Sequence, residues 1–270
     1  LDGDLTISGG LSVTGENAVA VAIDGGATGG VTGDVLVRGG ATIIGTNAQG
    51  LLVGAPIGGE LRINGAWNST GYSTVNRPAD TSDLDADDLQ QSGSPIAVHF
   101  SVDGGITIEG VGVEDDEDDD GDGVTEADGD TDDDLTTSIN AYGSAPALLI
   151  QADPSADLVL GATASGYGLH VRGTIAAQGV YDGVEATAIE IAGDGGAQVT
   201  TAGGIAIDNV TGAAAVEADA TAVHIGAGAV VPEILIRRAV TGAVTAETAQ
   251  TAYGVRIDAR AHVAALNVTG

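Results

Sequence analysis

The sequence contains no cysteine, no methionine and no lysine, and aromatic residues make up only 3% of its 270 positions. Without cysteine the chain has neither disulfides nor a thiol nucleophile, and without lysine it has no Schiff-base chemistry. Small extracellular domains that lack disulfides need another source of rigidity, such as stacked repeats or bound metal. These absences narrow the enzyme classes that the chain could serve and favour a structural role.

Basic residues are also scarce, with eight arginines against 39 acidic residues and a net charge of −31. Nucleic-acid binding is excluded because phosphate contacts require a basic patch. No apolar run approaches the roughly 20 residues of a membrane-spanning helix, so we expect no membrane insertion in this fragment.

Glycine and aliphatic residues are abundant instead. The 44 glycines accompany a hydrophobic fraction of 43% that consists mainly of Val, Ile, Leu and Ala. Small aliphatic side chains with frequent Gly suit a narrow interior lined by short strands and closed by tight turns.

A five-residue unit recurs along the chain: aliphatic, any residue, aliphatic, polar, Gly. The alternation predicts a half-buried strand, and the Gly permits a sharp corner after it. Two near-copies end in Asn209 and Ala259 instead of Gly. The full copies are Leu5–Gly9, Leu11–Gly15, Val21–Gly25, Val35–Gly39, Leu61–Gly65, Ile106–Gly110, Leu169–Gly173, Ile189–Gly193 and Leu266–Gly270.

Strands this short favour an all-β parallel β-solenoid, a right-handed β-helix, as a single domain over residues 1–270. The alternative is a β-sandwich with many Gly-rich turns, but its hairpin signals are weak here. At roughly 20 residues per coil, the units predict about ten coils and a fibre near 50 Å long. From their alternation we expect Ile7, Val13, Ile23, Val37, Ile63, Val171, Ile191 and Val268 to be buried, and Arg62, His170, Arg172 and Glu190 to be exposed.

Two polar, acidic segments interrupt the repeat, at 68–95 and at 111–145. We interpret both as long loops that project from the solenoid and are candidates for calcium binding. Fourteen of the 39 acidic residues fall within 114–134, so the negative charge is concentrated locally.

The second insert carries the pattern Asp-x-Asp-x-Asp-Gly-x-x-Glu-x-Asp. Oxygen ligands at alternate positions, a Gly for the turn and a later carboxylate are what a Ca²⁺ loop needs. The spacing resembles the loops of EF-hand, dockerin and thrombospondin type 3 repeats, although position 12 is Gly129 rather than Glu. The predicted ligands are Asp118, Asp120, Asp122, Glu126 and Asp128, with the backbone carbonyl of Val124.

The alternative interpretation is a disordered acidic tract, which blocks of like charge often form. A second, weaker calcium candidate is the cluster Asp80, Asp83, Asp85, Asp87 and Asp88, which could equally be a solvated loop.

The sequence contains no arrangement of residues typical of an active site. The four histidines fall on the polar phase of their predicted strands, where we expect them at the surface. There is no Gly-x-Ser-x-Gly elbow and no phosphate-binding Gly-x-x-x-x-Gly-Lys. A polysaccharide-degrading β-helix is the enzyme alternative; it would need paired carboxylates about 5–10 Å apart beside an arginine. We predict no catalytic residues and no organic cofactor.

Several segments resemble the passenger regions of bacterial type V autotransporters. They are Asp85–Leu89, Gly121–Thr125, Tyr142–Ala147, Gly179–Val184 and Ile225–Ile234. The resemblance implies a right-handed β-helical passenger that is exported through an outer-membrane barrel and displayed at the cell surface.

From the repeat, the calcium pattern and this resemblance we expect an extracellular structural or adhesive protein, such as a stalk or adhesin. The alternative is a subunit of an extracellular filament built by end-to-end stacking. We expect further copies or further chain to contact both ends of the solenoid, because neither end shows a capping sequence. A cell-surface or matrix polysaccharide is a second candidate partner.

Overall fold

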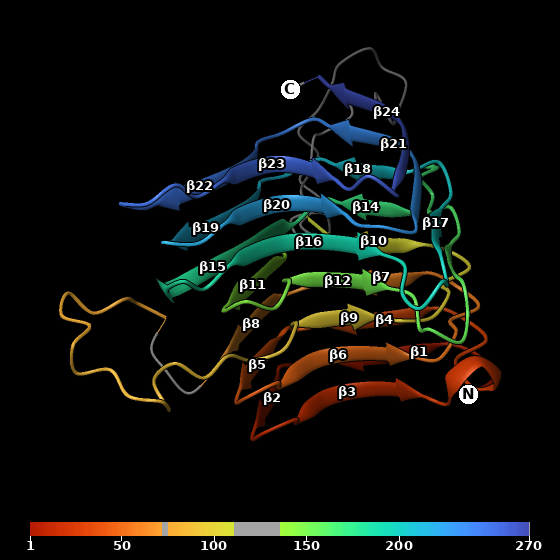
Figure 1. Ribbon diagram of the computed structural model, residues 1–270. Coiled ribbons are helices and arrows are strands. Elements are labelled where there is room, and N and C mark those ends of the chain that lie inside the picture. The colour runs from red at the N-terminus through yellow and green to blue at the C-terminus, as the bar shows by residue number, and fades with distance from the viewer. Residues whose placement is uncertain (72–74, 111–135, 270) are drawn as a thin grey trace, which may run out of the picture.

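The computed structural model describes residues 1–71, 75–110 and 136–269. Over these residues the chain forms a β-solenoid, in which short strands stack into three sheets along one axis (Figure 1). Every pair of neighbouring strands in the three sheets is parallel. The predicted all-β parallel solenoid is therefore confirmed, while its right-handedness stays a prediction.

The first sheet, sheet A, has ten strands. The long strand β21 pairs with both β17 and β18, and β24 pairs with β21. The strands of sheet A are β1 (Leu5–Ser8), β4 (Val35–Arg38), β7 (Leu61–Ile63), β10 (Ile106–Ile108), β13 (Leu158–Leu160), β14 (Leu169–Val171), β17 (Val199–Thr201), β18 (Ile205–Ile207), β21 (Ala229–Ile236) and β24 (His262–Val268).

Sheets B and C have seven strands each. Sheet B contains β2 (Leu11–Thr14), β5 (Ala41–Ile44), β8 (Ala66–Thr70), β11 (Ser138–Tyr142), β15 (Thr174–Asp182), β19 (Thr211–Val216) and β22 (Val240–Thr245). Sheet C contains β3 (Val19–Asp24), β6 (Gln49–Gly54), β9 (Ile96–Val98), β12 (Leu148–Gln151), β16 (Ala186–Ala192), β20 (Ala220–Ile225) and β23 (Ala252–Ile257). The helical element of the described ranges is a single short turn, η1 (Gly26–Thr28), and no helix there is long and apolar enough to cross a membrane.

The coils are longer and fewer than predicted. Corresponding positions in consecutive coils, such as Asp4 and Asp34, lie 30 residues apart. Each coil visits all three sheets and turns a corner after each strand, which takes more chain than the roughly 20 residues we expected. Seven stacked strands at about 4.8 Å spacing span roughly 30 Å, in place of the predicted 50 Å.

Aliphatic side chains fill the interior in rows that run along the solenoid axis. The first aliphatic residues of successive units pair in register, as Leu61, Ile106, Leu169 and Ile205 do, and all four are fully buried. The one tryptophan, Trp67, is also fully buried, and its Nε1 donates to the carbonyl of Asn64 at 3.1 Å. The burial of this continuous apolar stack is the main source of stability.

Glycine closes the five-residue unit for two different reasons. Gly65 has a φ of +95°, a left-handed conformation that side chains other than Gly rarely adopt. At Gly173 the limit is space, because a Cβ there would lie 2.8 Å from the carbonyl oxygen of Glu109 in the coil below. Backbones approach closely at both corners, since a Cβ on Gly65 would lie 2.5 Å from the backbone nitrogen of Gly40, but only Gly65 also requires the left-handed conformation.

The burial predictions hold in the middle of the stack and fail at its two outer coils. Ile23, Val37, Ile63, Val171 and Ile191 are buried as predicted. Ile7 and Val13 are only half-buried, and Val268 is 66% exposed, because the described coils cover them from one side only. Of the residues predicted to be exposed, Arg62 is exposed, whereas Arg172, His170 and Glu190 are partly buried.

The two inserts are shorter than predicted. Residues 68–70 belong to β8 in sheet B, so the first connection runs from 71 to 95. Residues 138–142 of the second segment form β11 and pair with β8 and β15. The polar composition of these residues reflects outward-facing strand positions, for example Asn68 and Asn140, whose amides are joined by a hydrogen bond of 3.0 Å.

Candidate functional site

The predicted calcium ligands Asp118, Asp120, Asp122, Val124, Glu126 and Asp128 all lie outside the described residues. The structure therefore does not test this site. Within the described ranges, no group of three or more His, Asp or Glu side chains is arranged to hold a metal ion.

The weaker calcium candidate, 80–88, is described, and its carboxylates serve as local turn acceptors. Asp80 accepts hydrogen bonds from the backbone N–H and the hydroxyl of Ser82, and these bonds hold the pKa of its carboxyl below the usual range. Asp85 accepts from the N–H of Asp87, and Asp88 accepts from the N–H of Asp85. Contacts of this kind order a loop without bringing its oxygens to a common point.

A row of polar side chains follows the strands of sheet A, and we call it the sheet A row. It consists of the residue that directly follows the strand in five successive coils, after β7, β10, β14, β18 and β21. From Glu109 onward, the backbone N–H of each member donates to the carbonyl of the last strand residue in the coil below, as that of Asp208 does to Val171. The members are Asn64, Glu109, Arg172, Asp208 and Arg237.

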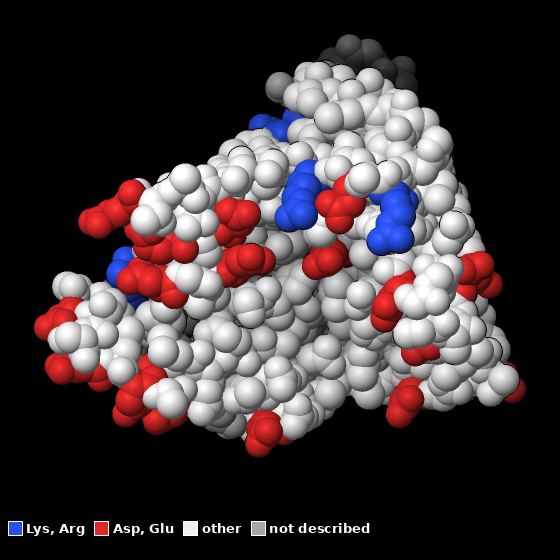
Figure 2. Space-filling view, viewed as in Figure 1, with Lys and Arg blue, Asp and Glu red and all other residues white. Residues whose placement is uncertain are grey.

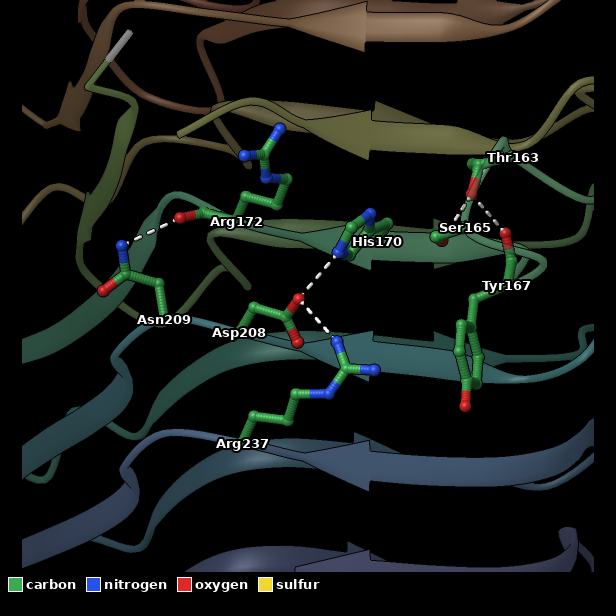
Figure 3. Close-up of polar contacts among 8 residues, drawn as sticks. All are labelled: Thr163, Ser165, Tyr167, His170, Arg172, Asp208, Asn209 and Arg237. Carbon is green, nitrogen blue, oxygen red and sulfur yellow. Dashed lines mark hydrogen bonds and ion pairs between the residues drawn. The ribbon is translucent and has the colours of Figure 1, made fainter. Parts of the chain in front are cut away.

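Charges of opposite sign alternate along this row, and its centre is Asp208 (Figure 3). One oxygen, Oδ2, lies 2.9 Å from Nε2 of His170 and 2.9 Å from Nη1 of Arg237. These partners come from β14 in the coil below and from the end of β21 in the coil above. Asp208 is 4% exposed at its side chain. It thus ties three consecutive coils together through charged hydrogen bonds.

Two opposing effects set the protonation of Asp208. Burial alone would raise the pKa of its carboxyl, but the hydrogen bond and charge of His170 and the guanidinium of Arg237 outweigh burial and hold the pKa below the usual range. Asp208 therefore stays ionised at neutral pH. An ionised, cation-paired carboxylate cannot serve as the general acid of a glycosidase.

The same pattern repeats on either side of the Asp208 cluster. Glu109 forms an ion pair with Arg62, whose Nη2 lies 2.5 Å from Oε1. On the other side, the hydroxyl of Tyr167 donates to Glu233 at 2.8 Å, and burial together with this carboxylate raises the pKa of the phenol. The carboxylates of Glu109 and Glu233 thus each have a side-chain partner from another coil.

The enzyme alternative required two carboxylates beside an arginine. Glu109 and Asp208 lie two strand spacings apart, about 10 Å, with Arg172 between them in the row. Both carboxylates are paired with cations. Two cavities of about 330 and 400 Å³ lie away from this row: one between Val75–Arg77 and sheet B, the other beside Val31 and Pro56. The sheet A row thus has the spacing of a sugar-cleaving pair, but both of its carboxylates are engaged by cations of neighbouring coils.

Sequence reasoning missed the histidines. We expected His170 and His224 at the surface, but their side chains are only 15% and 16% exposed, because each lies against carboxylates of neighbouring coils. The sequence does place both histidines at polar positions of their strands. Only the strand register shows that carboxylates of neighbouring coils lie beside them. Comparison with known proteins adds no assignment: no family model, no curated protein and no solved structure matches this chain.

Proposed function

We propose that this chain is an extracellular structural or adhesive protein, a solenoid with a calcium-stabilised insert that serves as a stalk or adhesin at a bacterial surface. The observation that carries the proposal is the unbroken stack of aliphatic rows, each coil held to the next by backbone ladders and by matched charges such as those around Asp208. Stacked coils of this kind form a stiff rod in which each coil contacts its neighbours alone.

The outer face of sheet C supports an adhesive role. Figure 2 shows that much of this face is uncharged, although the chain carries 39 acidic residues. One outward row consists of Ala22, Leu52, Ala97 and Leu149, paired in register on β3, β6, β9 and β12. Ala97 is itself buried, and beyond Leu149 the row continues into Glu190 of β16. A flat face with few charges can approach a neutral polysaccharide without the desolvation of carboxylates.

Binding without turnover distinguishes an adhesin from the polysaccharide-degrading alternative. We expect the purified chain to be retained on one or more insoluble bacterial or matrix polysaccharides and to release no new reducing ends from them. Replacing Leu52 and Leu149 by Asp should abolish retention, whereas replacing the exposed Leu89 of the insert by Asp should not. Release of sugar fragments would contradict the proposal, as would retention that is indifferent to both changes.

Location is tested separately. If the chain is displayed on the surface, antibodies against it should label intact producing cells, and added protease should remove the label. Labelling that requires cell lysis would contradict an extracellular position.

The calcium part of the proposal depends on the spacing of Asp118, Asp120, Asp122, Glu126 and Asp128. Calorimetry should detect heat on addition of Ca²⁺ to the full chain, and the double substitution Asp120→Asn and Asp122→Asn should remove it. The matched control, Asp85→Asn with Asp87→Asn, changes the same charge in the other insert and should leave the heat intact. No heat with the unmodified chain would contradict calcium binding.

The filament alternative is favoured by apolar side chains along the open edge of sheet A. Leu266 and Val268 are 48% and 66% exposed in β24. Either another copy or further chain would bury them. Sedimentation over a hundredfold range of concentration distinguishes a stalk, whose size is constant, from a polymer that grows by end-to-end contact.

A further inference from the structure

A second charged cluster lies on the outer face of sheet C, away from the sheet A row. Glu190 on β16, His224 on β20 and Arg256 on β23 occupy the same register position in three consecutive strands. Asp258 follows β23 directly, and its backbone N–H donates to the carbonyl of Ile225. The sheet register therefore places one imidazole between carboxylates from the coil below and the coil above.

Each nitrogen of the His224 ring faces a different carboxylate. Nδ1 lies 3.5 Å from Oε1 of Glu190, and Nε2 lies 3.2 Å from Oδ2 of Asp258. Because the carboxylates lie on opposite sides of the ring, they do not converge on a point where a metal could bind, and no other group of described side chains is arranged to hold one. The arrangement suits an imidazolium, which carries a proton on both nitrogens.

The remaining charged group of the cluster is Arg256, whose Nε lies 3.3 Å from the other oxygen of Asp258. Asp258 therefore keeps a cation when His224 is neutral. Glu190 differs from Asp258, because among the described residues the ion pair of its carboxylate is with His224. Loss of the imidazolium charge thus removes an attraction on both sides of β20 and leaves the two carboxylates facing a neutral ring.

β23 is the strand that this cluster affects most. Among the described strands it pairs with β20 alone, at the edge of sheet C. The side chain of His224 is 16% exposed, so water screens its contacts less than it screens those of a surface histidine. Edge strands are also where local opening needs the least free energy.

We propose that His224, Glu190 and Asp258 form a pH-operated clamp across β16, β20 and β23, which fastens β23 to the solenoid while the imidazole is protonated and loosens it once the imidazole is neutral. The clamp is separate from the proposed adhesive function and from calcium binding. It makes the stability of one edge of the solenoid respond to acidity in the range where histidine titrates.

The direction of the effect follows from linkage. The Glu190 carboxylate, with Asp258, raises the pKa of His224 above its usual value of 6.5, against the opposing effect of burial. A raised pKa in the folded state means that the stabilisation is complete below the unfolded pKa and is lost as the pH rises through the folded pKa. The clamp is closed at pH values below the unfolded pKa of histidine and opens as the pH rises through the raised pKa of His224.

Hydrogen exchange of the full chain between pH 5.5 and 8.5 tests the clamp, after correction for the intrinsic exchange rate. Exchange within 252–257 should accelerate as the pH rises, by up to roughly tenfold for each unit by which folding raises the pKa of His224. His224→Gln should show the fast, alkaline behaviour at every pH. The matched control is His99→Gln, because the ring of His99 contacts a carbonyl, that of Gln151, at 2.9 Å; it should keep the pH dependence.

A direct titration covers the case in which the His224→Gln chain does not fold. The ring carbon signals of His224 in the unmodified chain should titrate above 6.5 by NMR, and Glu190→Gln should lower the midpoint. The proposal is overturned if the midpoint lies at or below 6.5, or if exchange within 252–257 has the same pH dependence in His224→Gln as in the unmodified chain.

Discussion

At the scale of single residues, the corners between sheets B and C have a conformation that the repeat unit did not predict. Asn17, Asn47 and Glu217 all adopt positive φ, at 54°, 54° and 50°. Each occupies the same corner in its own coil, between a strand of sheet B and the following strand of sheet C. Asn is common in this conformation, but Glu is not. Glu217 is held there by its carboxylate, which accepts from the N–H groups of Glu247 and Thr248.

The corner residues give a first prediction. Asn47→Ala forces a Cβ-bearing residue without a compensating side-chain bond into the left-handed region, and should lower the free energy of unfolding by about 1–2 kcal/mol. Asn47→Gly loses the same amide, which bonds Asn17 at 3.3 Å, but relieves the strain. Urea denaturation of both variants isolates the backbone effect. Equal stability of the two would show that the conformation carries no strain.

Asp208 gives a second prediction, at acid pH. Its lowered pKa means that its stabilising effect is present above the unfolded pKa and is lost as the pH falls through the folded pKa. Asp208→Asn should lower stability at pH 7 by about 1.5–3 kcal/mol, because His170 and Arg237 lose a charged acceptor. The variant should also lose less stability than the unmodified chain on acidification. Asp194→Asn, at an exposed loop position, is the control and should change neither quantity.

At the scale of elements, the sequence predicts where strands lie but not which strands pair with one another. Alternation located Val35–Gly39, Leu61–Gly65 and Leu169–Gly173 as strands with a corner, and each is one. The register was hidden because coil length varies: the spacing between equivalent positions is 30 residues from Asp4 to Asp34 but 26 from Asp34 to Glu60. Ile108 pairs with Val171 across the whole of 111–135. The alternating charges of the sheet A row become visible only after this register is known.

Two matched core substitutions test whether the stability that a buried side chain contributes depends on having a coil on each side. Ile7 and Ile63 occupy the same position in β1 and β7, both in register with Val37 of β4. Ile63→Ala should lower the free energy of unfolding by about 2–5 kcal/mol, because coils on both sides enclose the cavity. Ile7→Ala should lower it by less than half as much, since Ile7 is only half-buried. Thermal unfolding of both variants measures the difference; equal losses would contradict a stack in which burial depends on two neighbours.

At the scale of the whole molecule, two kinds of interaction are separated along the sequence. The solenoid is held by aliphatic burial and backbone ladders, with ion pairs between coils such as Arg62–Glu109 and Arg237–Asp208. The densest negative charge lies in 114–134, which holds 14 of the 39 acidic residues. The sequence could indicate this separation from composition alone, because carboxylate runs and aliphatic repeats do not overlap. The sequence could not indicate which arginine pairs with which carboxylate, because pairs such as Arg62–Glu109 and Arg237–Asp208 join different coils.

This separation predicts how the molecule responds to the removal of calcium. Fourteen carboxylates within 21 positions repel one another unless cations lie between them, so a chelator should raise protease cleavage within 111–145. The coils do not depend on the ion, because their stability comes from apolar burial, which carries no charge. The far-ultraviolet circular dichroism of the β-sheets and the midpoint of thermal unfolding should therefore stay almost unchanged. Asp120→Asn with Asp122→Asn should reproduce the effect of the chelator on cleavage. If the chelator melted the sheets together with the insert, the ion would have to be part of the stack itself, and the proposed independence of insert and solenoid would be wrong.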